Sequence, residues 1–229
     1  MKRIFAALFS LIIFFIFCSS LNYKASFSSV TPKNSELYII IDAGHGGMDG
    51  GTSAADGTKE KDINLSISRI LNSLLIASGY NTVMLRSDDE LIGDNTLPTI
   101  RARKVSDIRK RLEIAESYQN SLLISIHQNY YPEFKYYGTQ VFYSNNSPES
   151  KYLAQSIQQS VVNKLQPDNK RKIKPVGTNI YLLYNCTIPA IMVECGFLSN
   201  VNEAEMLKSQ SYQLQVAFSI MQGIIDYLE

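Results

Sequence analysis

The sequence predicts an α/β fold in which a mostly parallel, twisted sheet of about six strands carries helices on both faces. Three observations support this prediction. Short, continuous apolar runs alternate with segments whose apolar residues recur at helical spacing. Such runs are typical of strands that are buried on both faces, as in a parallel sheet. No internal repeat or second globular unit interrupts the alternation, and 229 residues suffice for one hydrophobic core.

The predicted strands are short, rich in apolar or β-branched residues, and bounded by turn residues. The first, over 37–41, runs into a loop with glycines at positions 44, 46, 47, 50 and 51, which let the backbone turn sharply. Five more segments are predicted as strands: 80–85, 122–126, 139–143, 179–184 and 188–193.

Five segments are predicted as helices. From Glu60, apolar residues recur on one face, and Gly79 is well placed to end that helix. The others span 99–118, 151–165 with Pro148 and Glu149 at its start, 202–209 and 212–228. The segment 99–118 carries six Arg or Lys residues, which we interpret as a solvated face rather than a ligand site.

The first 35 residues differ in composition from the rest of the chain. Two basic residues precede an apolar run over 4–17, which has the length of a signal-peptide core and is short for a membrane-spanning helix. A serine-rich stretch follows and is typical of a linker. We therefore predict an export signal or membrane anchor plus linker over 1–35, either cleaved or retained, and a folded domain over 36–229. A buried core helix at the N-terminus is the less favoured alternative.

The charge balance argues against a nucleic-acid-binding protein, and the cysteine positions argue against a disulfide in the folded domain. Lys and Arg total 22 against 21 Asp and Glu, so the chain has no strong electrostatic footprint for nucleic acid. Cys186 and Cys195 bracket the predicted strand 188–193, and an extended chain would hold them too far apart for a disulfide. Side chains alternate along a strand, so Cys195 and its neighbour Glu194 are predicted to face opposite sides.

Polar residues gather where the predicted strands end. His45 and His127, the only two histidines, follow strands, and Arg86 and Glu194 lie at the ends of two others. Ligands of open α/β sheets bind beyond the carboxyl ends of the strands. Glu60 joins this group from the first turn of a helix that the glycine-rich loop leads into. We therefore expect one shared site.

Two histidines and one carboxylate form the ligand set of hydrolytic zinc, which keeps one position open for water. Glu60 opens a helix, where the helix dipole favours the ionised form expected of a ligand. Glu194 lies among apolar neighbours in AIMVECGF, where desolvation would raise its pKa toward that of a general base. Asp42 is a candidate to orient a histidine ligand, with a purely structural role at the strand end equally favoured.

Four motifs carry a resemblance to a known family. They are IIIDAGHGGMDGGT, EKDINLS from Glu60, SIHQN around His127 and PAIMVECGFLSN around Glu194. In order and spacing they resemble the zinc-dependent N-acetylmuramoyl-L-alanine amidases (amidase-3 type) of bacterial cell walls, over 37–229. The segments RKVSDIRKRLEIAES and TNIYLLYNCTIPAIMVECGFLSN are similar to the germination-specific, spore-cortex (CwlD-type) branch of that family.

The resemblance implies a catalytic domain over 36–229 that binds Zn²⁺ through His45, Glu60 and His127, with Glu194 as the catalytic carboxylate. It implies hydrolysis of the amide between the lactyl group of muramic acid and the first L-alanine of the stem peptide. In the spore branch, this is the first step toward muramic-δ-lactam, which a separate deacetylase completes.

Further expectations concern the substrate, the partners and the location. Arg86 and Asn129 are predicted to contact the peptidoglycan substrate. The resemblance implies an activating protein partner, a lipoprotein or similar, without which we expect the isolated domain to hold zinc weakly. It also implies action in the cell wall or the forespore intermembrane space. Two alternatives stay open: a zinc hydrolase that cleaves another wall bond, and a non-catalytic wall-binding protein.

Overall fold

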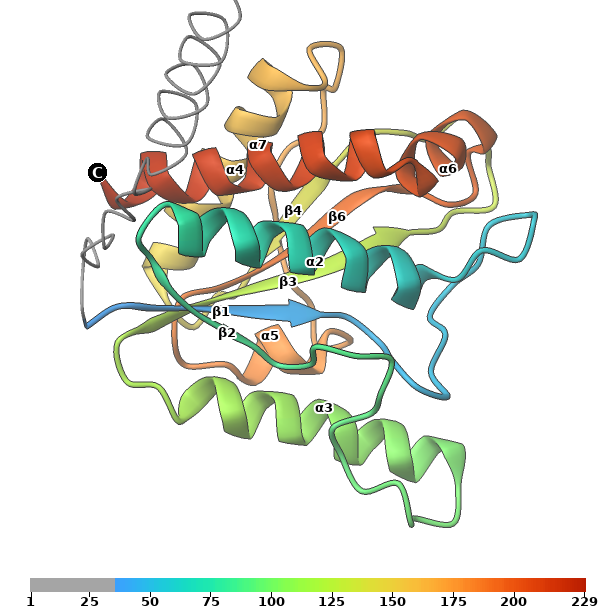
Figure 1. Cartoon of the computed structure of the whole chain (residues 1–229), viewed down its shortest axis with the longest axis vertical. Coiled ribbons are helices and arrows are strands. Elements are labelled where there is room, and N and C mark those ends of the chain that lie inside the picture. Colours follow the sequence, from blue (N-terminus) through green and yellow to red (C-terminus); the bar gives the residue numbers. More distant parts are fainter. Residues whose placement is uncertain (1–35) are drawn as a thin grey trace, which may run out of the picture. The chain divides into compact units, whose positions relative to one another are not determined.

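The computed structural model describes residues 36–229, so the predictions about residues 1–35 lie outside the described residues (Figure 1). Six strands form one sheet in the order β2-β1-β3-β6-β4-β5. They are β1 (Tyr38–Ala43), β2 (Asn81–Met84), β3 (Ser121–Asn129), β4 (Gln140–Tyr143), β5 (Lys174–Pro175) and β6 (Ala190–Phe197). The pairs β1–β2, β1–β3, β3–β6 and β4–β5 are parallel, and β4 is antiparallel to β6. The predicted mostly parallel sheet is confirmed.

Helices cover both faces of the sheet, as predicted. In Figure 1, α2 (Glu60–Ala77), α4 (Pro148–Lys164) and α7 (Gln210–Leu228) lie on one side of the strands. On the other side lie α3 (Ile100–Glu116) and α5 (Tyr181–Asn185), while α6 (Val201–Lys208) precedes α7. Alternation along β1 separates two cores: Ile39 and Ile41 pack in the α2–α4–α7 core, and Ile40 in the α3–α5 core.

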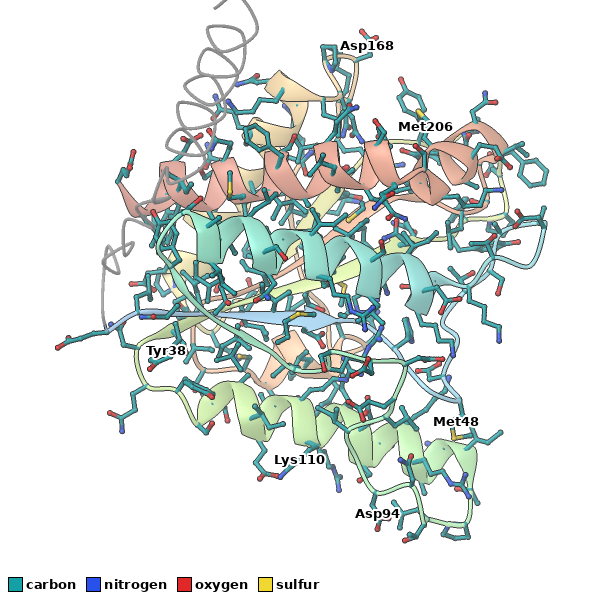
Figure 2. All side chains as sticks on the ribbon, in the orientation of Figure 1. Tyr38, Met48, Asp94, Lys110, Asp168 and Met206 are labelled. Carbon is teal, nitrogen blue, oxygen red and sulfur yellow. The ribbon has the colours of Figure 1, made fainter. Side chains whose placement is uncertain are left out.

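Local sequence sets the ends of several helices. Thr99 accepts a hydrogen bond from the Ala102 N–H and caps α3, which removes one unpaired donor from the first turn. Gly79 adopts a positive φ of 85° just after α2, in the left-handed conformation that ends helices. The outer face of α3 is solvated, and Figure 2 shows Lys110 pointing away from the sheet.

The prediction of a strand over 179–184 is wrong, because this segment forms α5 instead. The Tyr184 and Cys186 N–H groups donate to the carbonyls of residues 180 and 182. Leu182 and Leu183 are both buried, whereas a strand would turn consecutive side chains to opposite faces. The apolar run was too short for its period to distinguish helix from strand. The sixth strand is β5, two residues long, which the sequence did not predict.

The two described cysteines are free and buried on opposite sides of the sheet. Cys195 packs in the α2–α4–α7 core and Cys186 in the α3–α5 core, so the predicted lack of a disulfide between them is confirmed. Among the helices of residues 36–229, none combines the length and the apolar character needed to span a membrane.

Candidate metal and catalytic site

The carboxyl ends of β1, β3 and β6 meet at one edge of the sheet and bring the predicted site residues together. His127 on β3 lies in register with Glu194 on β6, and His45 follows β1. All three line a cavity of about 430 Å³, which also involves Asn179 and Tyr181 from the α5 segment.

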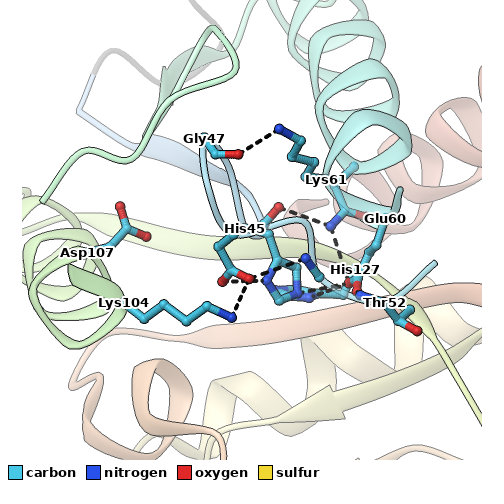
Figure 3. A network of polar contacts seen from close by, with 12 residues as sticks. His45, Gly47, Thr52, Glu60, Lys61, Lys104, Asp107 and His127 are labelled. Atoms are coloured by element: carbon cyan, nitrogen blue, oxygen red, sulfur yellow. Dashed lines mark hydrogen bonds and ion pairs between the residues drawn. The ribbon is translucent and has the colours of Figure 1, made fainter. Parts of the chain in front are cut away.

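The predicted ligand set closes into one cluster. His45, Glu60 and His127 each offer a ligand atom, and these atoms lie within 4.8 Å of one another (Figure 3). Glu60 Oε1 is 3.2 Å from His45 Nε2 and 2.9 Å from His127 Nδ1. The two imidazole rings meet edge to face with centroids 4.9 Å apart.

Several backbone and side-chain donors fix the buried Glu60 carboxylate. The Thr52 N–H donates to Oε2 at 2.8 Å, and the Gln128 N–H donates to Oε1 at 3.1 Å. The latter lies where the β3–β6 register shifts after His127, an irregularity typical of active-site strands. Burial raises the pKa of Glu60, but the two imidazoles outweigh burial and hold the pKa far below its ordinary value.

His45 is held by a carboxylate that the sequence analysis missed. Its Nδ1 donates to Asp49 Oδ2 at 2.9 Å, which leaves Nε2 directed at Glu60. Lys104 from α3 pairs with the same Asp49 at 2.6 Å (Figure 3). Burial lowers the pKa of His45, but hydrogen bonds to Asp49 and Glu60 outweigh burial and raise it to about 9. Such a partner fixes the tautomer and orientation of a histidine ligand.

Two glycines of the loop make room for the ligand side chains. A Cβ on Gly44 would lie 2.2 Å from His127 Nε2, so the His127 ring occupies the space of a side chain at position 44. A Cβ on Gly51 would lie 2.5 Å from Glu60 Oε2, and Gly51 also has a positive φ of 67°. Only glycine allows this close approach of backbone to the cluster.

Glu194 differs from Glu60 in having no donor on one of its oxygens. Among the described residues, no group hydrogen-bonds to its buried Oε2. Burial raises the pKa of Glu194 to about 7, and the nearby Glu60 charge acts in the same direction. A buried, unpartnered carboxyl oxygen beside the two histidines is suited to proton transfer near neutral pH.

The structure favours the structural alternative for Asp42 and argues against the substrate contact predicted for Arg86. Asp42 contacts no imidazole: its carboxylate accepts from Ser125 Oγ at 2.6 Å and from the Arg111 guanidinium. Arg86 is 1% exposed and donates only to backbone carbonyls, including those of residues 43 and 44. It therefore lies beneath the loop, which is incompatible with the predicted contact to substrate. Asn129 ends β3, and its contact with substrate stays a prediction.

Arg111 overturns the interpretation of α3 as a purely solvated basic helix. It is 1% exposed and lies between Asp42 and Asp107, each within ion-pair distance. Nothing in the sequence pattern distinguishes Arg111 from the five other basic residues of this segment. Asp49, in contrast, could have been found, because it lies inside the glycine-rich loop four residues after His45.

The donor set fits a zinc ion. It combines two imidazole nitrogens with one carboxylate oxygen, as is typical of hydrolytic zinc sites; Asp49 orients His45, and backbone N–H groups orient Glu60. His45 and His127 line the same cavity as Glu194, so an ion held by this donor set would lie beside that carboxyl group.

Comparison with known proteins decides the family. The model of the N-acetylmuramoyl-L-alanine amidase family matches residues 39–226, which include the whole candidate site. The chain belongs to this family. This amidase is 34% identical over 219 residues to the germination-specific N-acetylmuramoyl-L-alanine amidase of Bacillus subtilis (strain 168). The aligned region covers 95% of this chain and 90% of the relative.

Solved structures agree with the assignment. The CwlD amidase from Clostridioides difficile, in complex with the GerS lipoprotein, is 38% identical with a TM-score of 0.80, over 83% of this chain and 98% of that one. An N-acetylmuramoyl-L-alanine amidase from Clostridium difficile 630 is 30% identical with a TM-score of 0.73, over 85% of this chain and 98% of that one. The chain is therefore an N-acetylmuramoyl-L-alanine amidase that acts on peptidoglycan.

Proposed function

We propose that this amidase is a zinc hydrolase of the spore cortex, where cleavage between N-acetylmuramic acid and L-alanine is the first step toward muramic-δ-lactam. One observation carries the proposal of metal-dependent chemistry: His45, Glu60 and His127 converge, while Glu194 lies in register with His127 on the adjacent strand. The cortex assignment rests on similarity to the germination-specific relative.

The residues have distinct roles in the proposed mechanism. His45, Glu60 and His127 would hold the Zn²⁺, which when bound polarises a carbonyl and lowers the pKa of water. Glu194 Oε2 accepts a proton from the attacking water as the new C–O bond forms at the lactyl carbonyl. As the C–N bond breaks, Glu194 donates that proton to the leaving alanine nitrogen, so the amine departs neutral and the carboxylate is regenerated.

Substrate contacts are proposed along the rim beyond β3. Asn129 lies two residues beyond His127, and the loop that follows exposes Tyr130, Tyr131, Phe134 and Tyr137. Exposed aromatic rings offer flat apolar faces with polar edges, which suit stacking on sugar rings. We propose that Asn129 contacts the stem peptide or the muramic acid, and that these rings contact neighbouring sugars.

The proposed location and partners follow from the relatives. We propose export across the cytoplasmic membrane through residues 1–35, with residues 4–17 as signal or anchor. A relative was solved in complex with a lipoprotein, which supports an activating partner of that kind here. A separate muramic-acid deacetylase would consume the amide-free muramic acid that this reaction leaves.

A peptidoglycan digest tests the proposal. Purified cortex peptidoglycan is incubated with the protein, with and without a chelator, and the products are analysed by mass spectrometry. We expect free stem peptides with N-terminal L-alanine, loss of this product with chelator, and recovery with added Zn²⁺. Release of a different fragment would indicate another bond, and no zinc-dependent release would favour a non-catalytic binding protein.

The variant Glu194→Gln separates metal binding from catalysis. Zinc content should stay at the wild-type level because Glu194 is not a proposed ligand. Turnover should fall about 100- to 10,000-fold, the usual contribution of a positioned acid–base group. Hydrolysis at the wild-type rate would exclude the role assigned to Glu194.

A further inference from the structure

Two buried arginines donate hydrogen bonds to three consecutive backbone carbonyls, those of residues 43–45, which end at the proposed ligand His45. Arg111 on α3 donates through Nη1 to the Ala43 carbonyl at 2.9 Å and through Nη2 to the His45 carbonyl at 2.7 Å. Arg86, just after β2, donates through Nε to the Ala43 carbonyl at 2.7 Å and through Nη2 to the Gly44 carbonyl at 3.0 Å. The backbone of residues 43–45 is thus held from two different elements.

This backbone adopts an unfavourable conformation at a proposed ligand. His45 has a φ of 62° and is the only non-glycine residue with positive φ in the described chain. Outside glycine, this region costs free energy and persists where surrounding contacts impose it. The Arg111 bond to the His45 carbonyl acts directly on the strained residue.

Two aspartates fix the Arg111 guanidinium itself. Its Nε donates to Asp107 at 2.7 Å, and its Nη1 pairs with Asp42, which Ser125 Oγ holds at 2.6 Å. Asp107 also accepts from the Ile92 N–H at 2.7 Å, which ties the loop after β2 to α3. The guanidinium therefore has a fixed position, since its rigid fork of donors is occupied by defined acceptors.

We propose that Arg111 is a positioning residue for the metal site: it imposes the left-handed backbone at residue 45 and so directs the His45 ring toward Glu60 and His127. The inference rests on the proposed function, because it assumes that His45 is a ligand. Arg86 assists by holding the two preceding carbonyls, and Asp49 then fixes the ring of His45 from its other nitrogen.

The variant Arg111→Lys keeps the charge but removes the fork of donors. We compare its metal-free thermal unfolding and its Zn²⁺ dissociation constant, measured by competition with a chromophoric chelator, with those of the wild type. Arg109→Lys is the matched control, since Arg109 is exposed on the same helix. We expect Zn²⁺ binding to weaken about 10- to 100-fold in Arg111→Lys and to stay within about twofold in the control.

A double-mutant cycle distinguishes positioning of His45 from general support of the fold. In a His45→Ala background, Arg111→Lys should change Zn²⁺ affinity by less than about twofold, because the ligand on which it acts is gone. An equally large loss in that background would overturn the proposal, as would wild-type affinity in the folded single variant. If Arg111→Lys fails to fold, Arg86→Lys replaces it. Unchanged Zn²⁺ affinity in that variant would overturn the claim that arginine hydrogen bonds to the backbone of residues 43–45 position the His45 ligand.

The wild type separates this inference from the proposed function. Failure of the wild type to bind Zn²⁺ even weakly, at any concentration tested, would refute the proposed metal site itself. Zinc binding by the wild type together with unaffected binding by folded Arg111→Lys would refute only the positioning role.

Discussion

Two glutamates of the site, Glu60 at the start of α2 and Glu194 on β6, have opposite properties because of their surroundings. Glu60 receives backbone N–H donors and lies against two imidazoles, which favour its ionised form. The Oε2 atom of the half-buried Glu194 is buried without a donor, which favours the protonated form of this carboxyl group. Carboxylates whose environments separate their pKa values in this way commonly divide the work of ligand and proton carrier.

The burial of Glu194 predicts a stability cost in the metal-free protein. The unfolded chain loses the Glu194 proton near pH 4.5, whereas the folded protein loses it near pH 7. Between these values the folded state holds the extra proton, so this contribution to stability falls as pH rises and stays lost above pH 7. Metal-free Glu194→Gln should therefore be more stable than wild type above pH 7, by up to about 3 kcal/mol.

Thermal unfolding with zinc removed, followed across pH, measures this cost. The melting temperatures of Glu194→Gln and wild type should converge below pH 4.5. The exposed Glu90→Gln is the control and should show no such divergence. A Glu194→Gln variant less stable than wild type at high pH would contradict the assigned pKa direction.

The pKa of His45 predicts a proton release on zinc binding. With a pKa of about 9, His45 is protonated at neutral pH in the metal-free protein and must lose this proton to bind zinc. Calorimetry in buffers of different ionisation enthalpy should report about one proton released per Zn²⁺ at neutral pH, declining above pH 9. Zinc affinity should rise with pH over the same range, and pH-independent affinity would contradict the assignment.

At the scale of single elements, the long periodic segments could be predicted and the short ones could not. The helix from Glu60 and the strand that leads to His127 have enough residues for their type to be clear from the sequence. The five-residue α5 does not, and β5 has only two residues, whose place in the sheet depends on pairing with β4. Tertiary contacts decide whether such short segments form a helix or a strand.

The same limit applies to the site. Strand ends and glycine spacing identified His45, His127, Glu60 and Glu194, because parallel strands bring their carboxyl ends together. Arg111, which holds the His45 carbonyl, comes from α3, whose register against the loop is set only by folding. For that reason Arg111 was interpreted as a solvated residue. The burial of Arg86 beneath the loop likewise depends on tertiary contacts that the sequence pattern does not show.

The loop between β3 and β4 supplies an element-scale prediction about substrate. Asn200 donates to the Phe134 carbonyl at 2.9 Å, and the Tyr131 N–H donates to Ser199 Oγ at 3.1 Å, so the loop is anchored to the segment after β6. Tyr130 is nevertheless 51% exposed. Tyr130→Ala should raise KM for glycan-linked substrate with little change in kcat, because it removes a ring–sugar contact of about 1 kcal/mol.

Two comparisons check this prediction. Tyr152→Ala on α4, where the side chain is 64% exposed, removes an equivalent ring away from the site and should leave KM unchanged. A short muropeptide that lacks neighbouring sugars should be cleaved equally well by Tyr130→Ala and wild type. Equal KM values of Tyr130→Ala and wild type on the long glycan would show that Tyr130 does not contact the substrate.

At the scale of the whole molecule, the proposed metal joins three parts of the domain that are distant in sequence. His45 follows β1, Glu60 opens α2 and His127 lies on β3, so a bound ion would connect two adjacent strands and a helix. A ligand that binds only the folded state stabilises it according to its concentration relative to its dissociation constant.

Zinc should therefore raise the melting temperature of the amidase. At a concentration 100 times the dissociation constant, the gain is about 2.7 kcal/mol, which corresponds to roughly 5–10 °C for a domain of this size. Calorimetric scans over a zinc series give the affinity, and a partner lipoprotein that tightens zinc binding would shift the series to lower concentrations. His45→Ala should lose most of the gain, and an equal gain in that variant would place the metal elsewhere.

The placement of the two cysteines in opposite cores has a practical consequence for measuring motion at the site. Burial raises the pKa of the Cys186 thiol to about 12 and raises that of Cys195 further, so within residues 36–229 neither thiol is a ready target for maleimide reagents. A cysteine introduced at Tyr130 on the loop and another at Tyr152 on α4 would accept a fluorophore pair without removal of Cys186 or Cys195. The distance between the dyes would then report directly on whether the loop closes over bound glycan.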